Sequence, residues 1–391
     1  MRSEELLARL VALDSSSRAG NRPIADFICN YVDGPGVRII RNPAPQGDKL
    51  NLVIARGPRR DDRAGLLLSG HMDTVPFDEP DWDSDPLGLT RRDDRYVGRG
   101  VCDMKGFLAL AVHRFGELNP AALRRPLVLL LTYDEELGTL GARHFVETWG
   151  GEEPLPRAAV IGEPTSFGVV RMHKGHLRLR VELLGRPGHS AYPMTGINAI
   201  EIAARVVDRL GELKQCLTTE LTADSPLFDP VPYTTLNLGT ISGGVALNVI
   251  PARCQLGLGI RLLPGTTGAE MAERVRQAVE LGIGDAAPAA AGGYRVEVVG
   301  ESPAMSTTDA APIHRALCRR LGQSESRAVA YASDAGWLRR LDLDCVLCGP
   351  GSIETAHRAN EWLPVADFDR AERLVADLVD EWCGAETAPA G

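Results

Sequence analysis

The chain alternates between short apolar runs and segments with helical periodicity. Leu52–Ala55, Pro126–Thr132 and Ala158–Ile161 are almost wholly apolar. Continuous apolar runs of this length are typical of strands that helices bury on both faces. Segments before and between these runs, such as Pro23–Val32 and Lys105–Leu118, have the spacing of amphipathic helices. This alternation predicts an α/β fold, with a mixed, mostly parallel sheet flanked by helices.

The pattern changes in the middle of the chain. From His176 the expected order is strand, helix, strand, strand, helix, strand, which is the ferredoxin-like arrangement. These elements are expected at Leu177–Leu184, Asn198–Leu213, Thr235–Ile241, Cys254–Leu262, Gly268–Leu281 and Tyr294–Val299. Strand and helix patterns alternate again after Ala310. We therefore expect a catalytic domain in two parts, residues 1–174 and 301–391, with an inserted α+β domain at residues 175–300.

Charge and cysteine content narrow the possible functions. The 391 residues carry a formal net charge of −9, and no run of Lys and Arg is interleaved with aromatic residues, so a nucleic acid partner is not expected. No segment resembles a signal peptide or a membrane span, which predicts a cytoplasmic protein with no membrane partner. The eight scattered cysteines are expected to be reduced. Cys345 and Cys348 form a C-x-x-C pair inside an apparent buried strand, so a structural role is favoured over zinc binding.

One apolar run ends in a histidine and a carboxylate. The segment Leu68–Pro76 contains His71 and Asp73, and residues two apart in an extended chain point to the same side. Parallel strands deliver their last residues to a crevice at the carboxyl edge of the sheet, where ligands bind. Taken alone, two residues are a weak signal, and the segment is better explained by a buried histidine that is hydrogen-bonded to a nearby aspartate.

Four further segments place acids or a histidine after an apolar strand or at the start of a helix. Each has an ordinary explanation, such as a helix cap, a solvated turn or a loop histidine. The residues are Asp103, Glu135, Glu136, Glu163 and His357. Carboxylates that leave buried strands toward one sheet edge raise one another's pKa unless a cation lies among them. One or two divalent metal ions would resolve this repulsion.

Counting the donors favours two ions. One ion could take His71 and Glu163, and the other Glu136 and His357, with the carboxylate of Asp103 bridging both. Mixed imidazole and carboxylate donors suit Zn²⁺, with Co²⁺ or Mn²⁺ tolerated.

Two acids remain after this count. Neighbouring residues in a strand point opposite ways, so Glu135 would be free to take a proton while Glu136 binds metal. Asp73 would accept the second ring N–H of His71 and so orient that ligand.

Together, the five segments resemble the M20 family of co-catalytic zinc amidohydrolases and peptidases, in the same order and over nearly the whole chain. The resemblance implies the same ligand set, with Glu135 as general acid/base and Asp73 as the partner of a ligand. It also implies that the inserted domain, roughly Gly175–Gly300, is a lid that forms a homodimer.

The resemblance also implies roles for residues that spacing alone would leave unassigned. His189, in Gly188–Pro193, matches a lid histidine that reaches the active site of the partner subunit and stabilises the oxyanion. Asn248 and Arg261 match positions that hold the substrate carboxylate. Gly349 and Gly351 match a turn whose backbone amides bind that carboxylate.

Within the family, several segments are most similar to the acetylornithine deacetylases. They are Val170–His176, Val231–Gly239, Gly349–Ile353 and Asn360–Trp362. This resemblance implies a dizinc amidohydrolase that converts N2-acetyl-L-ornithine to L-ornithine and acetate in arginine synthesis. The segment Tyr331–Trp337 departs from that subgroup, with Asp334 where a glutamate is expected.

Other functions remain open at this point. The nearest is a succinyl-diaminopimelate desuccinylase or another N-acyl-amino-acid deacylase, for example one acting on acetylcitrulline. Two more distant possibilities are a non-catalytic, metal-stabilised binding protein on the same scaffold and a protein with a single structural zinc.

Overall fold

The computed structural model describes residues 1–284 and 293–384, which divide into two compact units. One unit comprises Met1–Arg171, Ser306–Arg327 and the described residues from Ser333 onward; the other comprises Met172–Met305 and Ala328–Ala332. The glycine- and alanine-rich stretch 285–293, expected from its composition to be a flexible loop, lies almost entirely outside the described residues.

The first unit is built on a mixed sheet. Six of the strands of this sheet are β1 (Arg38–Pro43), β2 (Leu50–Arg56), β3 (Leu66–His71), β6 (Leu127–Thr132), β7 (Ala158–Ile161) and β17 (Asp344–Leu347), in the order β1-β2-β6-β3-β7-β17. The four strands β6, β3, β7 and β17 are parallel, whereas β1 and β2 pair antiparallel at one side. The mostly parallel sheet predicted from the sequence is confirmed.

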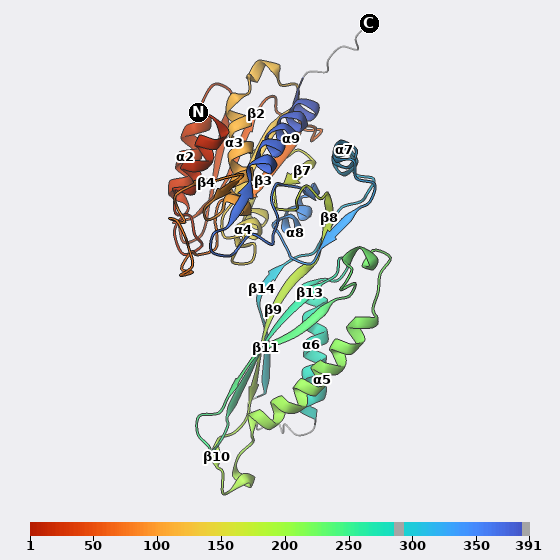
Figure 1. The fold of residues 1–391 in the computed structure, drawn as a ribbon. Coiled ribbons are helices and arrows are strands. Elements are labelled where there is room, and N and C mark those ends of the chain that lie inside the picture. The colour runs from red at the N-terminus through yellow and green to blue at the C-terminus, as the bar shows by residue number, and fades with distance from the viewer. Residues whose placement is uncertain (285–292, 385–391) are drawn as a thin grey trace. The chain divides into compact units, whose positions relative to one another are not determined.

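Helices flank this sheet, which explains why its strands are apolar throughout. They are α1 (Ser3–Val11), α2 (Arg22–Val32), α3 (Gly106–Glu117), α4 (Leu140–Thr148), α7 (Pro312–Leu321), α8 (Ala335–Leu338) and α9 (Val365–Cys383) (Figure 1). In β6, Leu129 and Leu131 join the core formed with α1, α2, α3 and α9. Val128 and Leu130, which are equally buried, alternate with them and point to the opposite face.

A second small sheet in this unit was not predicted. It pairs β4 (Thr90–Arg92), β5 (Arg95–Val97) and β18 (Trp362–Pro364) in the order β18-β5-β4. Strands of three residues are too short to give a periodic sequence signal. Their pairing brings the segment after residue 78 next to the segment before α9.

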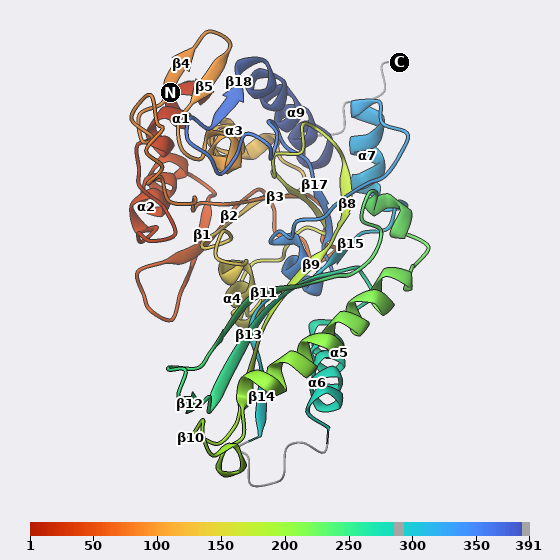
Figure 2. The ribbon, with the colours of Figure 1, turned by 60° about the horizontal axis from the view of Figure 1, so that its bottom comes forward.

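The second unit is a four-stranded antiparallel sheet with two helices on one face (Figure 2). The strands are β9 (Gly175–Leu184), β11 (Thr235–Gly243), β13 (Arg253–Leu262) and β14 (Tyr294–Ser302), and the helices are α5 (Ala199–Thr219) and α6 (Gly268–Ile283). Their order, β11-β13-β9-β14, is that of a ferredoxin-like domain. Alternate residues of β13, such as Leu256 and Leu258, are buried against α5 and α6.

The second unit is slightly longer than the insertion expected at 175–300. Strand β14 runs on to Ser302, which pairs with His176 of β9. The strand was predicted to end at Val299 because the residues that follow, up to Ser302, are not apolar and carry no hydrophobic signal. Short strands lie where the chain passes between the units: β8 (Val170–His173), β15 (Met305–Ser306) and β16 (Arg327–Val329).

Among the described residues, no helix combines the length and apolar character needed to cross a membrane. The eight cysteines are free thiols, and Cys345 and Cys348 are both buried. Burial raises the pKa of each of these two thiols to about 12.

A buried histidine in the second unit makes its stability depend on pH. The Nδ1 of His173 lies 3.0 Å from the carbonyl oxygen of Lys174 and so carries the proton, whereas Nε2 has no hydrogen-bond partner in the described part of the chain. Burial lowers the pKa of this imidazole from 6.5 to about 4.

Because the folded pKa of His173 is depressed, its contribution to stability is fully present above pH 6.5 and is lost as pH falls toward 4. We expect this group alone to lower the free energy of unfolding by about 2 kcal/mol between pH 7 and pH 5. His173→Asn keeps the donor toward Lys174 and removes the titration. Urea denaturation of wild type and His173→Asn at pH 7 and pH 5 should show that the free energy of unfolding falls more in wild type. An equal fall in the two proteins would contradict the prediction.

Candidate active site

The parallel strands bring their polar carboxyl ends to one edge of the first sheet. In the register of β3 and β6, His71 pairs with Thr132, and in that of β3 and β7, Ser69 pairs with Ile161. The loops that follow these strands carry the predicted acids. The edge is therefore the place where side chains from different parts of the sequence meet.

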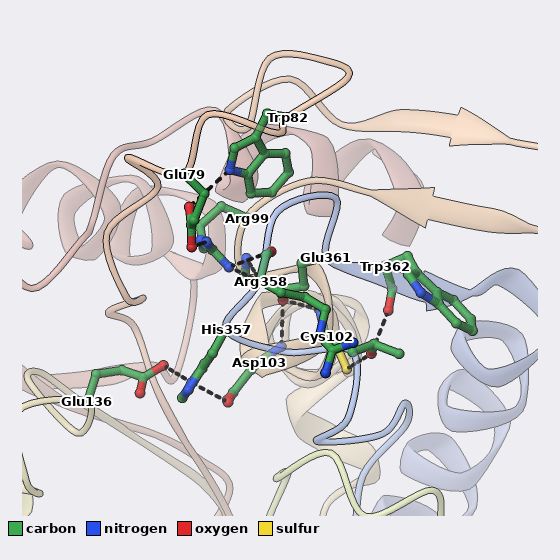
Figure 3. Close-up of polar contacts among 12 residues, drawn as sticks. Glu79, Trp82, Arg99, Cys102, Asp103, Glu136, His357, Arg358, Glu361 and Trp362 are labelled. Atoms are coloured by element: carbon green, nitrogen blue, oxygen red, sulfur yellow. Dashed lines mark hydrogen bonds and ion pairs between the residues drawn. The ribbon is translucent and has the colours of Figure 1, made fainter.

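Asp103 lies between two histidines. Its Oδ1 is 2.9 Å from Nε2 of His71, and its Oδ2 is 3.2 Å from Nε2 of His357 (Figure 3 shows the His357 side). The same nitrogen of His357 is 2.9 Å from Oε1 of Glu136. One carboxylate thus presents one oxygen to each histidine.

All five predicted ligands fall into two overlapping groups. His71, Asp103 and Glu163 form one, and Asp103, Glu136 and His357 form the other, with the potential ligand atoms of each group within 4.8 Å of one another. Asp103 belongs to both groups. This is the arrangement that two metal ions bridged by one carboxylate require, and the imidazole and carboxylate donors fit divalent ions such as zinc.

The charges of this cluster are poorly balanced by the protein itself. Burial, and then the neighbouring carboxylates, raise the pKa values of Glu135, Glu136 and Glu163. Hydrogen bonds to Asp103 and then Glu136 raise the pKa of His357 to about 10. The acids outnumber the two histidines, so cations placed between them would lower the energy of the folded protein.

Asp73 has contacts that differ from those expected. The Nδ1 of His71 lies 2.9 Å from the backbone carbonyl of Asp73, and 3.6 Å from the nearest carboxylate oxygen. The two carboxylate oxygens instead accept the backbone N–H groups of Glu135 and Glu136, each at 3.1 Å. The side chain of Asp73 therefore holds the turn that carries both glutamates.

The two glutamates do not lie in the strand, contrary to the expectation. Strand β6 ends at Thr132, and Asp134 has a left-handed backbone, with φ 49°. Glu135 and Glu136 follow in a turn, so strand alternation does not separate them. It is this turn that gives the two side chains different surroundings. Within it, Oδ1 of Asp134 forms an ion pair with Nζ of Lys49 at 2.6 Å.

Asp103 does not stand at the start of a regular helix, as was expected. Helix α3 begins at Gly106, and Asp103 lies in the irregular turn Val101–Lys105 with φ −124° and ψ 93°. A cap at the end of a regular helix would have pointed the carboxylate at the helix amides. The irregular turn leaves both oxygens available to the histidines.

The glycine-rich turn near His357 also differs from the expectation. The N–H of Gly349 donates to Thr165 Oγ1 at 3.3 Å, and that of Gly351 to Asp367 Oδ2 at 3.3 Å. Both amides are thus occupied within the protein. Glycine is needed here for close packing, because a Cβ at Gly349 would lie 2.3 Å from the carbonyl oxygen of Gly162.

The candidate residues of the second unit lie at two ends of its sheet. His189 is in β10 (Gly188–His189), which pairs with β12 (Val249–Ile250), and the carbonyl of Asn248 accepts the N–H of Ser190. Arg261 pairs with His176 at the opposite end of β9 and β13. The eight residue steps from Arg253 to Arg261 correspond to about 27 Å of extended chain. Arg261 and Asn248 of one chain are therefore far apart.

Asp334, where the sequence departs from the acetylornithine deacetylases, belongs to the first unit and is fully buried. Its Oδ2 accepts the hydroxyl of Thr132 at 2.5 Å, while Oδ1 has no hydrogen-bond partner in the described residues. Burial raises its pKa to about 7. Spacing alone did not indicate this contact, because Asp334 reaches the end of β6 from a segment far away in the sequence.

Known proteins resemble this chain over most of its length. The model of peptidase family M20/M25/M40 matches residues 67–381. The chain is 36% identical to an acetylornithine deacetylase of Myxococcus xanthus, over 97% of each chain. It is 35% identical to one of Proteus mirabilis, over 96% of this chain and 94% of the relative.

Solved structures of lower identity share the fold. The M20 metallo-carboxypeptidase Sso-CP2 of Sulfolobus solfataricus aligns with a TM-score of 0.77 at 17% identity, over 98% of this chain and 99% of the other. The YXEP protein of Bacillus subtilis, described as a dinuclear metal-binding peptidase, aligns with a TM-score of 0.69 at 15% identity, over 97% and 96%. With the family match over most of its length, the chain belongs to peptidase family M20 and is a metal-dependent hydrolase.

Proposed function

We propose that this protein is a dizinc amidohydrolase that converts N2-acetyl-L-ornithine to L-ornithine and acetate, a step of arginine synthesis. The observation that carries the proposal is the position of Asp103, whose two oxygens face His71 and His357. The names of the relatives that are 33–36% identical over nearly the whole chain support the choice of substrate.

In this proposal, His71, Glu163 and Asp103 would hold one ion, and Asp103, Glu136 and His357 would hold the other. When bound, the ions polarise the scissile carbonyl and lower the pKa of water toward neutrality. Glu135 belongs to neither donor group. It removes the proton of the attacking water and delivers it to the departing amine.

His189 would stabilise the oxyanion that forms on the substrate. Its Nδ1 accepts the N–H of Ala191 at 3.1 Å, which places the ring proton on Nε2. An exposed Nε2–H is a suitable donor to an oxyanion. Asn248 and Arg261 would hold the substrate carboxylate. The amides of Gly349 and Gly351 are left out of this role because they have partners within the chain.

We further propose a homodimer formed through the second unit, with His189 acting in the site of the partner subunit. Arg261 and Asn248 lie at opposite ends of one sheet, so a single substrate can meet both only if they come from two chains. The end of the sheet near β12 also exposes apolar side chains, including Val245, which is 90% exposed, and Leu247, which is fully exposed. Such a patch is typical of a protein interface. The free thiols are compatible with the reducing cytoplasm.

The test is a substrate panel combined with metal analysis. We expect two zinc ions per chain and the highest kcat/KM for acetylornithine, compared with acetylcitrulline, acetyllysine and succinyl-diaminopimelate, in the zinc and cobalt forms. Faster cleavage of succinyl-diaminopimelate would make the protein a desuccinylase. A protein that holds both ions and cleaves no acyl amino acid would be a binding protein, and one ion per chain would refute the dinuclear centre.

Asp73→Asn is expected to retain both ions and to lower kcat by about 10–100-fold, the usual effect of losing a partner that orients an active-site group. The asparagine can accept only one of the two backbone N–H groups, so the turn with Glu135 and Glu136 would shift. Metal analysis and steady-state kinetics on one preparation check this. If Asp73→Asn instead lost one zinc ion, that result would indicate that Asp73 is a metal ligand.

A further inference from the structure

A buried glutamate holds the turn that carries Asp103. Glu361 is 1% exposed. Its Oε1 accepts the backbone N–H groups of Cys102 at 2.9 Å and of Asp103 at 3.1 Å (Figure 3). Its Oε2 accepts the backbone N–H of Gly100 at 3.0 Å. One carboxylate thus accepts three backbone N–H groups, two from the irregular turn and one from Gly100, the residue just before it.

A buried arginine completes the carboxylate's partners. Arg99 is also 1% exposed, and its Nη1 lies 2.9 Å from Oε2 of Glu361. The same nitrogen is 3.3 Å from the carbonyl oxygen of Arg358, the residue after His357, and Nη2 is 2.7 Å from Oε1 of Glu79. The planar guanidinium therefore joins the Glu361 side chain to the backbone next to His357.

The loop that carries His357 needs such support. His357 and Asn360 both have left-handed backbones, with φ 58° and φ 57°, a conformation that is uncommon for residues other than glycine. Surrounding contacts must hold this conformation. The side chain of Asn360 accepts the backbone N–H of Asp83 and donates to the backbone carbonyl of Asp81. Arg99 donates to the carbonyl of Arg358, the residue after His357.

We propose that Arg99 and Glu361 are positioning residues that set the distance between Asp103 and His357, and with it the affinity of the ion shared by Asp103, Glu136 and His357. Glu361 holds the backbone of one ligand, Arg99 holds the backbone beside the other, and their ion pair links the two. This inference rests on the proposed dinuclear centre. Neither side chain touches substrate or metal, so both act through the ligands.

The chemistry of the pair makes its substitutions informative. The carboxylate of Glu361 meets four donors, whereas the amide of glutamine accepts at one oxygen and turns its NH₂ group toward donors. Glu361→Gln should therefore release part of the turn. Arg99→Lys keeps the positive charge opposite Glu361. However, a single ammonium group cannot reproduce the contacts that Nη1 and Nη2 of the guanidinium make with different partners.

The experiment titrates the full-length apoprotein with zinc against a chromophoric chelator, and with cobalt while its visible absorption is recorded. We expect wild type to bind two ions. In Glu361→Gln and Arg99→Lys one of the two ions should bind about 10–100-fold less tightly than in wild type, as expected for the loss of ligand-orienting contacts. The cobalt spectrum of that ion should change as well.

The matched control is Glu153→Gln, which weakens another ion pair of the same unit, in which the glutamate is buried and its arginine is partly exposed. Glu153 accepts two hydrogen bonds from Arg38, at 2.7 and 2.8 Å, and touches none of the ligands. Its loss should lower the free energy of unfolding and leave both zinc affinities unchanged.

The outcomes separate the two proposals. Wild type that binds fewer than two ions would overturn the dinuclear centre itself. Wild type that binds two ions, with variants that bind both equally well, would overturn the positioning role. If Glu361→Gln fails to fold, Arg99→Lys alone decides.

Discussion

Glu135→Ala is expected to retain both metal ions and to lower kcat by about 10²–10⁴-fold, the usual contribution of general acid/base catalysis. Glu135 is outside both groups of potential ligands, so its removal should leave the metal sites intact. The substitution removes the group proposed to take the proton of water and return it to the amine. Burial, and then the charge of Glu163, raise the pKa of Glu135 above the usual range of a glutamate.

The measurement is steady-state kinetics together with metal analysis of one protein sample. Glu136→Ala, at the neighbouring position of the same turn, is the matched control and should lose an ion, because Glu136 belongs to a donor group. A Glu135→Ala enzyme that turns over at a rate close to wild type would refute its role as proton carrier.

Two inactive variants are expected to restore activity when they are mixed. If His189 acts in the site of the partner subunit, a heterodimer of His189→Ala and Glu135→Ala chains contains one complete site. It combines Glu135 of the first chain with His189 of the second. Random exchange in a two-fold dimer makes half of the dimers mixed, which gives about one quarter of the wild-type activity.

Each variant alone provides the baseline. Loss of a donor to the oxyanion lowers kcat by about 10²–10³-fold, so the recovery should stand out clearly. Subunit exchange must be shown separately, for example with chains of two different masses. Exchange without recovered activity would place His189 in the site of its own chain, and an absence of dimers would refute the proposed interface.

Much of the fold follows from local patterns in the sequence. Strand β7 was predicted at Ala158–Ile161 and is found there, because a short apolar run between polar segments has little freedom to be anything else. The ferredoxin-like order of the second unit was also predicted, since its strands alternate clearly between buried and exposed residues. The three-residue strands β4, β5 and β18 carry no such period and were missed.

The convergence of the five candidate ligands was expected for a related reason. Parallel strands end at one edge, so residues that follow β3, β6 and β7 must lie near one another. The backbone details were not predictable in this way. The turn that holds Glu135 and Glu136 depends on Asp73, and the partners of the Gly349 and Gly351 amides come from other segments of the chain.

The sequence by itself determined the residue types at the sheet edge, the alternation that builds the sheet and the family. Each of these depends on residues that are close together in the chain. Only the tertiary structure decided that the oxygens of Asp103 face two different histidines, and that Glu361 and Arg99 join the segments carrying them. The hydrogen bonds from Arg99 to Arg358 and from Cys102 to Glu361 connect segments more than 250 residues apart, and their geometry is set by packing that no local pattern records.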